Sequence, residues 1–263
     1  MGGFKYFIMN SFSIILISYK TKNLVDIAIR SFEKHKPKDF TLNYYIVETS
    51  NDTSYKDFVE GLADNIKFIS YPEAEVKQKQ IDPVGGSFAN GYGIELGKGY
   101  VEDDYTFICH SDVFVTSPSF FSELKQKVDE GYQLVGMSHD ATRIQAAHQS
   151  GLLVGTEILK ETNTMPQLPK LDVGDSLTQH CREANIPYFV FPCTFNKKEL
   201  NEVINEPYKS FGPTCGIDRT LDSNSNVMFM HLGRGTTKQQ GRYFKPGKIT
   251  HDKWVSICSE ILK

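Results

Sequence analysis

Short apolar runs alternate along the chain with stretches in which apolar residues recur every three or four positions. The first run, residues 13–18, is rich in β-branched residues. The stretch after it places Leu24, Ile27 and Phe32 on one face of a helix. This alternation is typical of α/β proteins with a largely parallel sheet. We therefore predict a mixed α/β fold in which helices flank a mostly parallel central sheet.

The same pattern continues to the end of the chain. It predicts further strands over 44–47, 66–71, 105–109, 133–137, 152–154, 188–191 and 227–231, and helices over 87–100, over 118–130 and from about 175. The segment 233–247 is basic and contains glycines, which indicates a mobile loop. We expect one domain over residues 1–220, and a C-terminal extension over 221–263 that completes the site with this loop and a terminal helix.

Composition narrows the class of protein. Lys and Arg (29) nearly balance Asp and Glu (32), so bulk charge does not predict nucleic-acid binding. The longest apolar runs are far shorter than the roughly 20 residues that cross a bilayer, and no secretory cleavage site follows the N-terminus. Five cysteines without C-x-x-C spacing favour reduced thiols. We expect a soluble protein of the cytoplasm.

Polar residues follow three of the predicted strands. They are Ser18 and Tyr19 after the first, residues 48–52 after the second, and residues 110–112 after the strand over 105–109. Because open α/β sheets bind ligands at the carboxyl ends of their strands, we expect these residues to meet at one site.

In their order and spacing, these strand ends resemble family 2 glycosyltransferases, whose fold is of the GT-A type. The resemblance covers residues 12–195, and it includes the helix start over 87–94 with Asn90. It implies that the first two strand ends hold the nucleotide. It also implies that residues 110–112 are the D-x-D-like motif that binds a metal ion and the diphosphate, with Ser111 among the contacts.

Asp112 is the candidate metal ligand. Departure of a nucleotide diphosphate builds negative charge, which a divalent cation stabilises, and hard cations prefer carboxylate oxygens. His110 stands where many family members carry the first acidic residue. His110 has three candidate roles: it ligates Mn²⁺, it contacts a phosphate, or it only orients Asp112. Alternatively, Asp112 merely caps the following turn.

The resemblance assigns the nucleotide to the earlier strand ends. It implies that Glu48 contacts the base or ribose, as a carboxylate accepts hydrogen bonds from N–H and hydroxyl groups. Asp52 is a second candidate, although aspartate in a turn often bonds its own backbone. Ser18 and Tyr19 would act through backbone contacts or aromatic stacking.

Asp172 and Asp175 lie three residues apart at a predicted helix start, and so on one face of that helix. The resemblance implies that one of them is the general base that takes a proton from the acceptor hydroxyl. We favour Asp175, and His148 is the next residue to test. The alternative is that both carboxylates only stabilise the helix N-terminus.

Two later residues complete the predicted site. His231 resembles a late histidine that binds metal or phosphate in related transferases. Arg234, in the basic segment that follows, is expected to close over the diphosphate. The alternative for that segment is a solvated tail.

We therefore predict a metal-dependent glycosyltransferase that uses Mn²⁺ or Mg²⁺. It would move a sugar from a nucleotide-diphosphate donor to a hydroxyl acceptor such as a glycan or a lipid-linked saccharide, and the resemblance implies inversion. A nucleotidyltransferase is the nearest rival enzyme, but residues 18–21 lack the glycines of its phosphate loop. A non-catalytic nucleotide- or sugar-binding module is the rival from another class.

Overall fold

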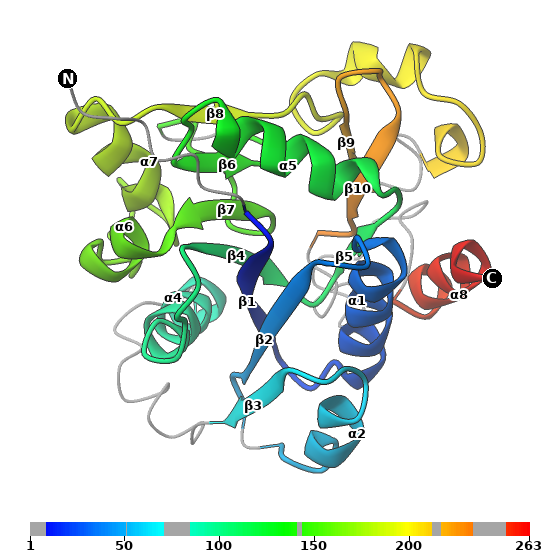
Figure 1. The fold of residues 1–263 in the computed structure, drawn as a ribbon, viewed down its shortest axis with the longest axis horizontal. Helices are drawn as coiled ribbons and strands as arrows, with labels where there is room; N and C mark the ends of the chain where they lie inside the picture. Colours follow the sequence, from blue (N-terminus) through cyan, green and yellow to red (C-terminus); the bar gives the residue numbers. More distant parts are fainter. Residues whose placement is uncertain (1–8, 51, 71–84, 141–143, 212–216, 234–250) are drawn as a thin grey trace.

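A seven-stranded sheet forms the centre of the fold (Figure 1). The computed structural model describes residues 9–50, 52–70, 85–140, 144–211, 217–233 and 251–263. The strands of this sheet are β1 (Ser11–Ser18), β2 (Thr41–Glu48), β3 (Ile66–Ser70), β4 (Tyr105–His110), β6 (Leu134–Gly136), β7 (Leu152–Gly155) and β8 (Tyr188–Val190). Their spatial order is β3-β2-β1-β4-β7-β6-β8.

All strands of this sheet point the same way except β7, which is antiparallel to both of its neighbours. The carboxyl ends of β1, β2, β4, β6 and β8 therefore lie along one edge. The predicted α/β fold with a mostly parallel central sheet is confirmed.

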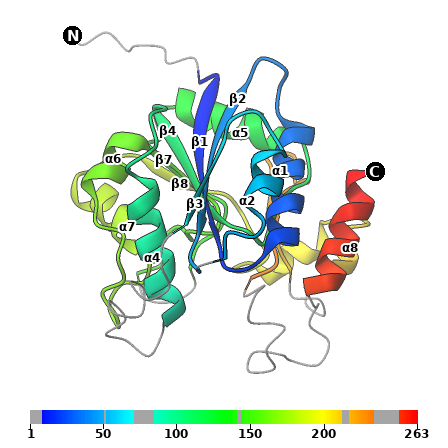
Figure 2. The same cartoon turned by 90° about the horizontal axis from the view of Figure 1, so that it is seen from below.

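Helices cover both faces of the sheet, as Figure 2 shows. The helices are α1 (Lys22–His35), α2 (Lys56–Glu60) and α5 (Ser119–Asp129) on one face, and α4 (Gly85–Gly97), α6 (Thr156–Glu161) and α7 (Asp175–Glu183) on the other. Strand β1 contributes to the core on both faces of the sheet, because successive side chains point to opposite faces. Ile14 and Leu16 pack in the core beneath α1 and α5, whereas Ile15 and Ile17 pack in the core beneath α4 and α7.

Helix α4 lies unusually close to β1. A Cβ added at Gly97 would lie 2.9 Å from Ile15, and one at Gly93 would lie 3.0 Å from Ile17. The two glycines are four residues apart and so share one helix face. Their role is close packing of helix on sheet, which fixes α4 beside the carboxyl end of β1.

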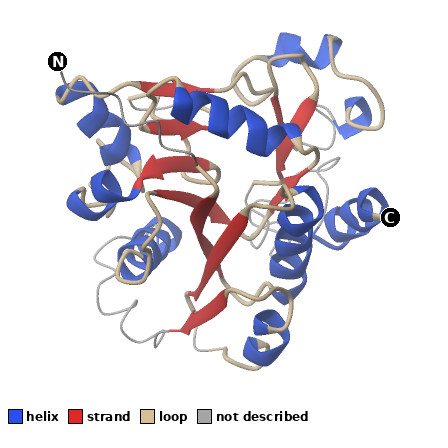
Figure 3. Ribbon diagram, viewed as in Figure 1, coloured by secondary structure: helices blue, strands red, loops and turns tan. Residues whose placement is uncertain are grey.

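A second, antiparallel sheet joins the first near Asp112. Its strands are β5 (Val113–Val115), β10 (Val227–His231) and β9 (Asp218–Leu221), in that order. Two residues, Ser111 and Asp112, separate β4 from β5, so the chain passes from the large sheet to the small one at Asp112. The two 3-10 helices, η1 (Lys198–Glu202) and η2 (Lys209–Phe211), lie between β8 and β9 (Figure 3).

The C-terminal helix α8 (His251–Leu262) packs against α1. Trp254 of α8 is fully buried, together with Leu24 of α1 and Phe114 of β5. The domain boundary expected after residue 220 falls inside β9. The small sheet and α8 are thus built onto the main domain through a shared core.

Among the helices in the described part of the chain, none is long and apolar enough to cross a membrane. Four cysteines, Cys109, Cys181, Cys193 and Cys258, are buried free thiols, and Cys215 lies outside the described residues. The cytoplasmic location stays a prediction.

Candidate active site

Asp112 lies in the turn between β4 and β5 and is only 4% exposed. The backbone N–H of Leu232 donates to the Asp112 carbonyl at 2.9 Å. His231, the residue before Leu232, pairs with Val113 across the small sheet. The strand pairing therefore holds His231 beside Asp112, although the two residues are 119 positions apart in the sequence.

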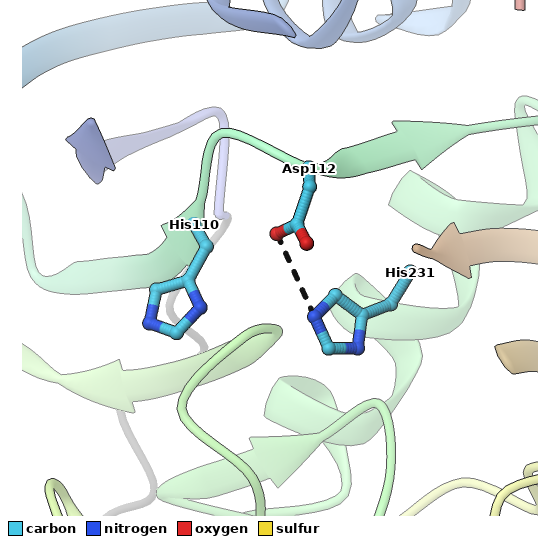
Figure 4. A group of neighbouring side chains, drawn as sticks. All are labelled: His110, Asp112 and His231. Atoms are coloured by element: carbon cyan, nitrogen blue, oxygen red, sulfur yellow. Dashed lines mark ion pairs between the residues drawn. The ribbon is translucent and has the colours of Figure 1, made fainter. Parts of the chain in front are cut away.

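The side chains of His110, Asp112 and His231 form a compact cluster (Figure 4). One ligand atom of each lies within 4.8 Å of the others, and the Asp112 Oδ1 to His231 Nε2 distance is 3.6 Å. A metal ion bonds such atoms at about 2.0–2.2 Å, so a single ion fits between the two with little movement. One carboxylate and two imidazoles suit a divalent transition ion. The structure thus brings together three residues that the sequence placed at the metal and diphosphate.

Neighbouring residues orient both imidazoles. Asp218 on β9 is the register partner of His231, and its Oδ2 lies 3.4 Å from His231 Nδ1. A carboxylate behind a histidine fixes the ring so that the other nitrogen faces the metal. Ser150 Oγ lies 2.8 Å from His110 Nδ1, and His110 Nε2 is buried with no hydrogen-bond partner among the described residues. Asp218 and Ser150 are not predicted from the sequence, because the charged β9 has no strand pattern and Ser150 lies in a polar loop.

His148 belongs to the same cluster. Its ring centroid is 5.5 Å from that of His231. The Ser150 N–H donates to His148 Nδ1 at 3.2 Å, so the neutral ring carries its proton on Nε2. This tautomer makes Nε2 a donor toward a ligand.

Burial keeps two of these histidines neutral. Burial, together with the nearby His231 and His110, lowers the pKa of His148 to about 3. Burial also lowers the pKa of His110 to about 4, although the charge of Asp112 opposes the change. Neutral imidazole is the form that binds metal, so His110 and His148 have the protonation state of metal-site histidines at neutral pH.

Glu48 has a different environment at the end of β2. Its carboxylate is fully buried and accepts hydrogen bonds from the backbone N–H groups of Lys20 at 3.1 Å and Ser50 at 2.9 Å, and from the Tyr55 hydroxyl. Burial and the charge of Glu48 raise the pKa of Tyr55. Lys20 has a positive φ of 55°, a conformation that needs such support. Glu48 therefore fixes the loop after β1, and its contact with a nucleotide stays a prediction.

A chain of buried hydroxyl groups runs from Tyr55 toward Asp112. Ser18 Oγ lies 2.9 Å from the Tyr55 hydroxyl and 3.0 Å from Thr21 Oγ1, which lies 2.8 Å from Ser111 Oγ. The side chains of Ser18 and Ser111 thus hold the strand ends together. Tyr19 is 37% exposed, and Lys20 after it is also exposed, so a ligand can reach both side chains at this strand end.

Three further residues, Asp52, Asn90 and Arg234, are predicted to contact the nucleotide sugar. Asp52 Oδ1 accepts the Ser54 N–H at 2.9 Å, and hydrogen bonds from Ser54 lower its pKa. This is the local turn bond expected as the alternative to a nucleotide contact. Asn90 lies in α4 and is partly buried. Arg234 lies outside the described residues.

The two aspartates at the start of α7 differ in their environments. Asp175 is 2% exposed, and its Oδ2 accepts the Asp172 N–H at 2.8 Å. Asp172 is partly exposed, and its charge acts to raise the pKa of His110. The geometry therefore gives Asp175 a bond that stabilises the helix start, and it places Asp172 within electrostatic reach of the histidine cluster.

No protein-family model matches the sequence, and no curated protein matches it. Among solved structures, the chain is similar to glucosyl-3-phosphoglycerate synthase from Mycobacterium tuberculosis in complex with Mn²⁺, UDP-glucose and phosphoglyceric acid (13% identity, 69% of each chain, TM-score 0.47). It is also similar to a mannosyltransferase from Pyrobaculum calidifontis in complex with GDP-mannose and Mn²⁺ (11% identity, 70% of this chain and 55% of that one, TM-score 0.48). Mouse xyloside xylosyltransferase 1 is a third (11% identity, 68% of this chain and 84% of that one, TM-score 0.44). Identities of 11–13% and TM-scores below 0.5 do not establish the function of this chain.

Proposed function

We propose that this protein is a metal-dependent glycosyltransferase of the GT-A type, which moves a sugar from a nucleotide-diphosphate donor to a hydroxyl acceptor. The observation that carries the proposal is the pairing of Asp112 with His231 at the carboxyl edge of the sheet, at 3.6 Å. The sequence pattern of the preceding strand ends supports it. Membership of family 2 stays a prediction.

Asp112 and His231 would hold the divalent ion, with His110 as the third ligand. When bound, the ion stabilises the charge that develops on the diphosphate as the sugar leaves. Two imidazoles in the ligand set favour Mn²⁺ or another transition ion over Mg²⁺, which prefers oxygen ligands. Asp218 and Ser150 keep the two rings oriented for this task.

The donor nucleotide would lie across the carboxyl ends of β1 and β2. Tyr19 offers an exposed ring there against which a base can stack. Glu48 would hold this surface in place, because its carboxylate accepts the backbone N–H of Lys20, the residue next to Tyr19. On this arrangement the diphosphate reaches Asp112 along the edge from β1 to β4.

Asp172 is the base that the geometry favours over Asp175. It would take the proton of the acceptor hydroxyl as that oxygen attacks the anomeric carbon, with inversion. Both carboxylates accept a backbone hydrogen bond, but Asp175 is nearly inaccessible whereas Asp172 is partly exposed. His148 is a poorer base because its Nδ1 accepts the Ser150 N–H.

A panel of nucleotide sugars incubated with the protein, with Mn²⁺ or with EDTA, tests the function. We expect slow, Mn²⁺-dependent hydrolysis of one donor to free sugar and nucleotide diphosphate. A nucleotidyltransferase would instead release pyrophosphate from a nucleoside triphosphate and a sugar phosphate. Tight binding of a nucleotide without turnover in any acceptor or donor combination would show a binding module.

A further inference from the structure

An exposed aromatic ring stands beside the histidine cluster. Phe195 follows β8 and is 44% exposed, although phenylalanine is usually buried. Its ring centroid lies 6.5 Å from that of His148, which lies 5.5 Å from His231. The ring thus belongs to the surroundings of the site.

The turn that carries Phe195 is firmly attached to the small sheet. Thr194 N–H donates to the Arg219 carbonyl at 3.0 Å, and the Arg219 N–H donates to Thr194 Oγ1 at 3.0 Å. The backbones of Cys193 and Thr220 form an isolated antiparallel β-bridge. The Lys197 N–H donates to the Cys193 carbonyl at 3.1 Å and so closes the turn. The same strand, β9, carries Asp218 behind His231. The ring is therefore held in a fixed place relative to the predicted metal ligands.

The sheet order assigns this ring to one side of the site. Strands β1, β2 and β3 lie on one side of β4, and β7, β6 and β8 lie on the other. With the nucleotide at the ends of β1 and β2, the ends of β6 and β8 are the part of this sheet edge that is left for the acceptor. Phe195 follows the carboxyl end of β8 and stands on that side.

The surroundings of the ring favour a carbohydrate over a lipid chain. The next four residues, Asn196, Lys197, Lys198 and Glu199, are polar and exposed. The other exposed large apolar side chains among the described residues are Tyr19, Phe58 and Val203, and none of these adjoins Phe195 in sequence. A single aromatic face amid polar groups suits a sugar ring, whose electropositive C–H groups meet the negative face and whose hydroxyls meet the polar rim.

We propose that Phe195 is the platform on which the ring of a sugar acceptor stacks, so that the acceptor is a carbohydrate. This inference rests on the proposed function and extends it to the acceptor. The ring would contribute to acceptor affinity and to orientation of the attacking hydroxyl. It would not contribute to metal or donor binding.

The test compares four variants: Phe195→Ala, Phe195→Leu, Phe195→Trp and, as a matched control, Phe58→Ala, at an aromatic side chain that is 40% exposed on α2. Methyl glycosides of glucose, galactose, mannose, xylose and N-acetylglucosamine serve as acceptors, and glycerol serves as a hydroxyl acceptor without a ring. Donor hydrolysis with Mn²⁺ is measured in parallel.

We expect Phe195→Ala and Phe195→Leu to raise the acceptor KM about three- to tenfold, and Phe195→Trp and Phe58→Ala to leave it within twofold. Donor hydrolysis should be unchanged in all four. Equal KM values for wild type, Phe195→Ala and Phe195→Leu would overturn the inference, as would a protein that hydrolyses donor but transfers to glycerol as well as to any sugar. If the wild type shows no Mn²⁺-dependent donor turnover, that result would instead contradict the proposed function itself.

Discussion

The two halves of the site satisfy their polar groups in different ways. At the ends of β1 and β2, Glu48 and the hydroxyl chain from Tyr55 to Ser111 have hydrogen-bond partners within the protein. Around Asp112, the carboxylate and imidazole atoms face each other at 3.4–3.6 Å, which is longer than a hydrogen bond. The first half is a scaffold that is complete without a ligand. The second half has the donor atoms and spacing that an ion needs.

This difference predicts which mutations affect metal binding or turnover and which affect stability. Removing a group from the scaffold leaves a buried donor without its acceptor, which lowers the free energy of unfolding. Removing a group from the cluster around Asp112 should change metal affinity or turnover and leave the fold intact.

The largest effect in this series is expected at Asp172. Asp172→Asn should lower the transfer rate about 10²–10⁴-fold, the usual range for a positioned base, with donor affinity nearly unchanged. Asp175→Asn is the matched control, and it should lower stability by about 1 kcal/mol through the lost helix-start bond with near-normal turnover. Transfer rates, donor affinities and melting temperatures of both variants give the answer. A slow Asp175→Asn beside a fully active Asp172→Asn would reverse the assignment.

Asp218→Asn should weaken Mn²⁺ binding about 10- to 100-fold, as expected for a residue that orients a metal-binding histidine. Asn keeps the size of the side chain but loses the charge that holds the His231 Nδ1 proton. Calorimetry with Mn²⁺ measures the effect. Asp222→Asn, on the turn after β9, is a control whose carboxylate binds the backbone of Asn224 and Asn226, and it should leave Mn²⁺ affinity unchanged. Equal affinity in wild type and Asp218→Asn would contradict the role of Asp218.

Glu48→Gln should act on stability. The loss of the charged acceptor for Lys20 and Tyr55 should cost about 1–3 kcal/mol in the free energy of unfolding, measured by urea denaturation. Mn²⁺ affinity should stay within twofold of the wild type. A stable Glu48→Gln protein that no longer binds nucleotide would show instead that the carboxylate contacts the donor directly.

The smallest effect is a pH dependence of the metal-free protein. The folded pKa values of His110 and His148, about 4 and about 3, lie below the ordinary value of 6.5. The unfolded chain therefore binds more protons as the pH falls below about 6.5, so stability should fall from about pH 6.5 down to about pH 4, the higher of the two folded pKa values. Melting temperatures in EDTA measure this, and His148→Gln should show a shallower slope. Identical slopes for the two proteins would contradict the depressed pKa of His148.

The sequence predicts those parts of the molecule that depend on local pattern. The buried strands β1, β2 and β4 and the amphipathic α1 follow directly from periodicity, and the strand-end positions of Asp112 and Glu48 follow with them. Strands β5 and β9 escape prediction because β5 has three residues and β9 carries Asp218 and Arg219. The roles of Asp218 and Ser150 depend on pairings across 13 and 40 positions, which no local pattern encodes. The enclosure of Glu48 by Tyr55 and Lys20 is likewise a tertiary contact.

The central claim is that Asp112 and His231 hold a divalent ion that binds the donor diphosphate. Calorimetric titration of UDP and GDP into the wild type and into Asp112→Asn, each with Mn²⁺, with Mg²⁺ and with EDTA, tests it most directly. We expect one nucleotide to bind the wild type with Mn²⁺ and to bind at least about a hundredfold more weakly with EDTA or to Asp112→Asn, while circular dichroism shows the same fold. Equal nucleotide affinity for the wild type and Asp112→Asn across all three conditions would contradict the account.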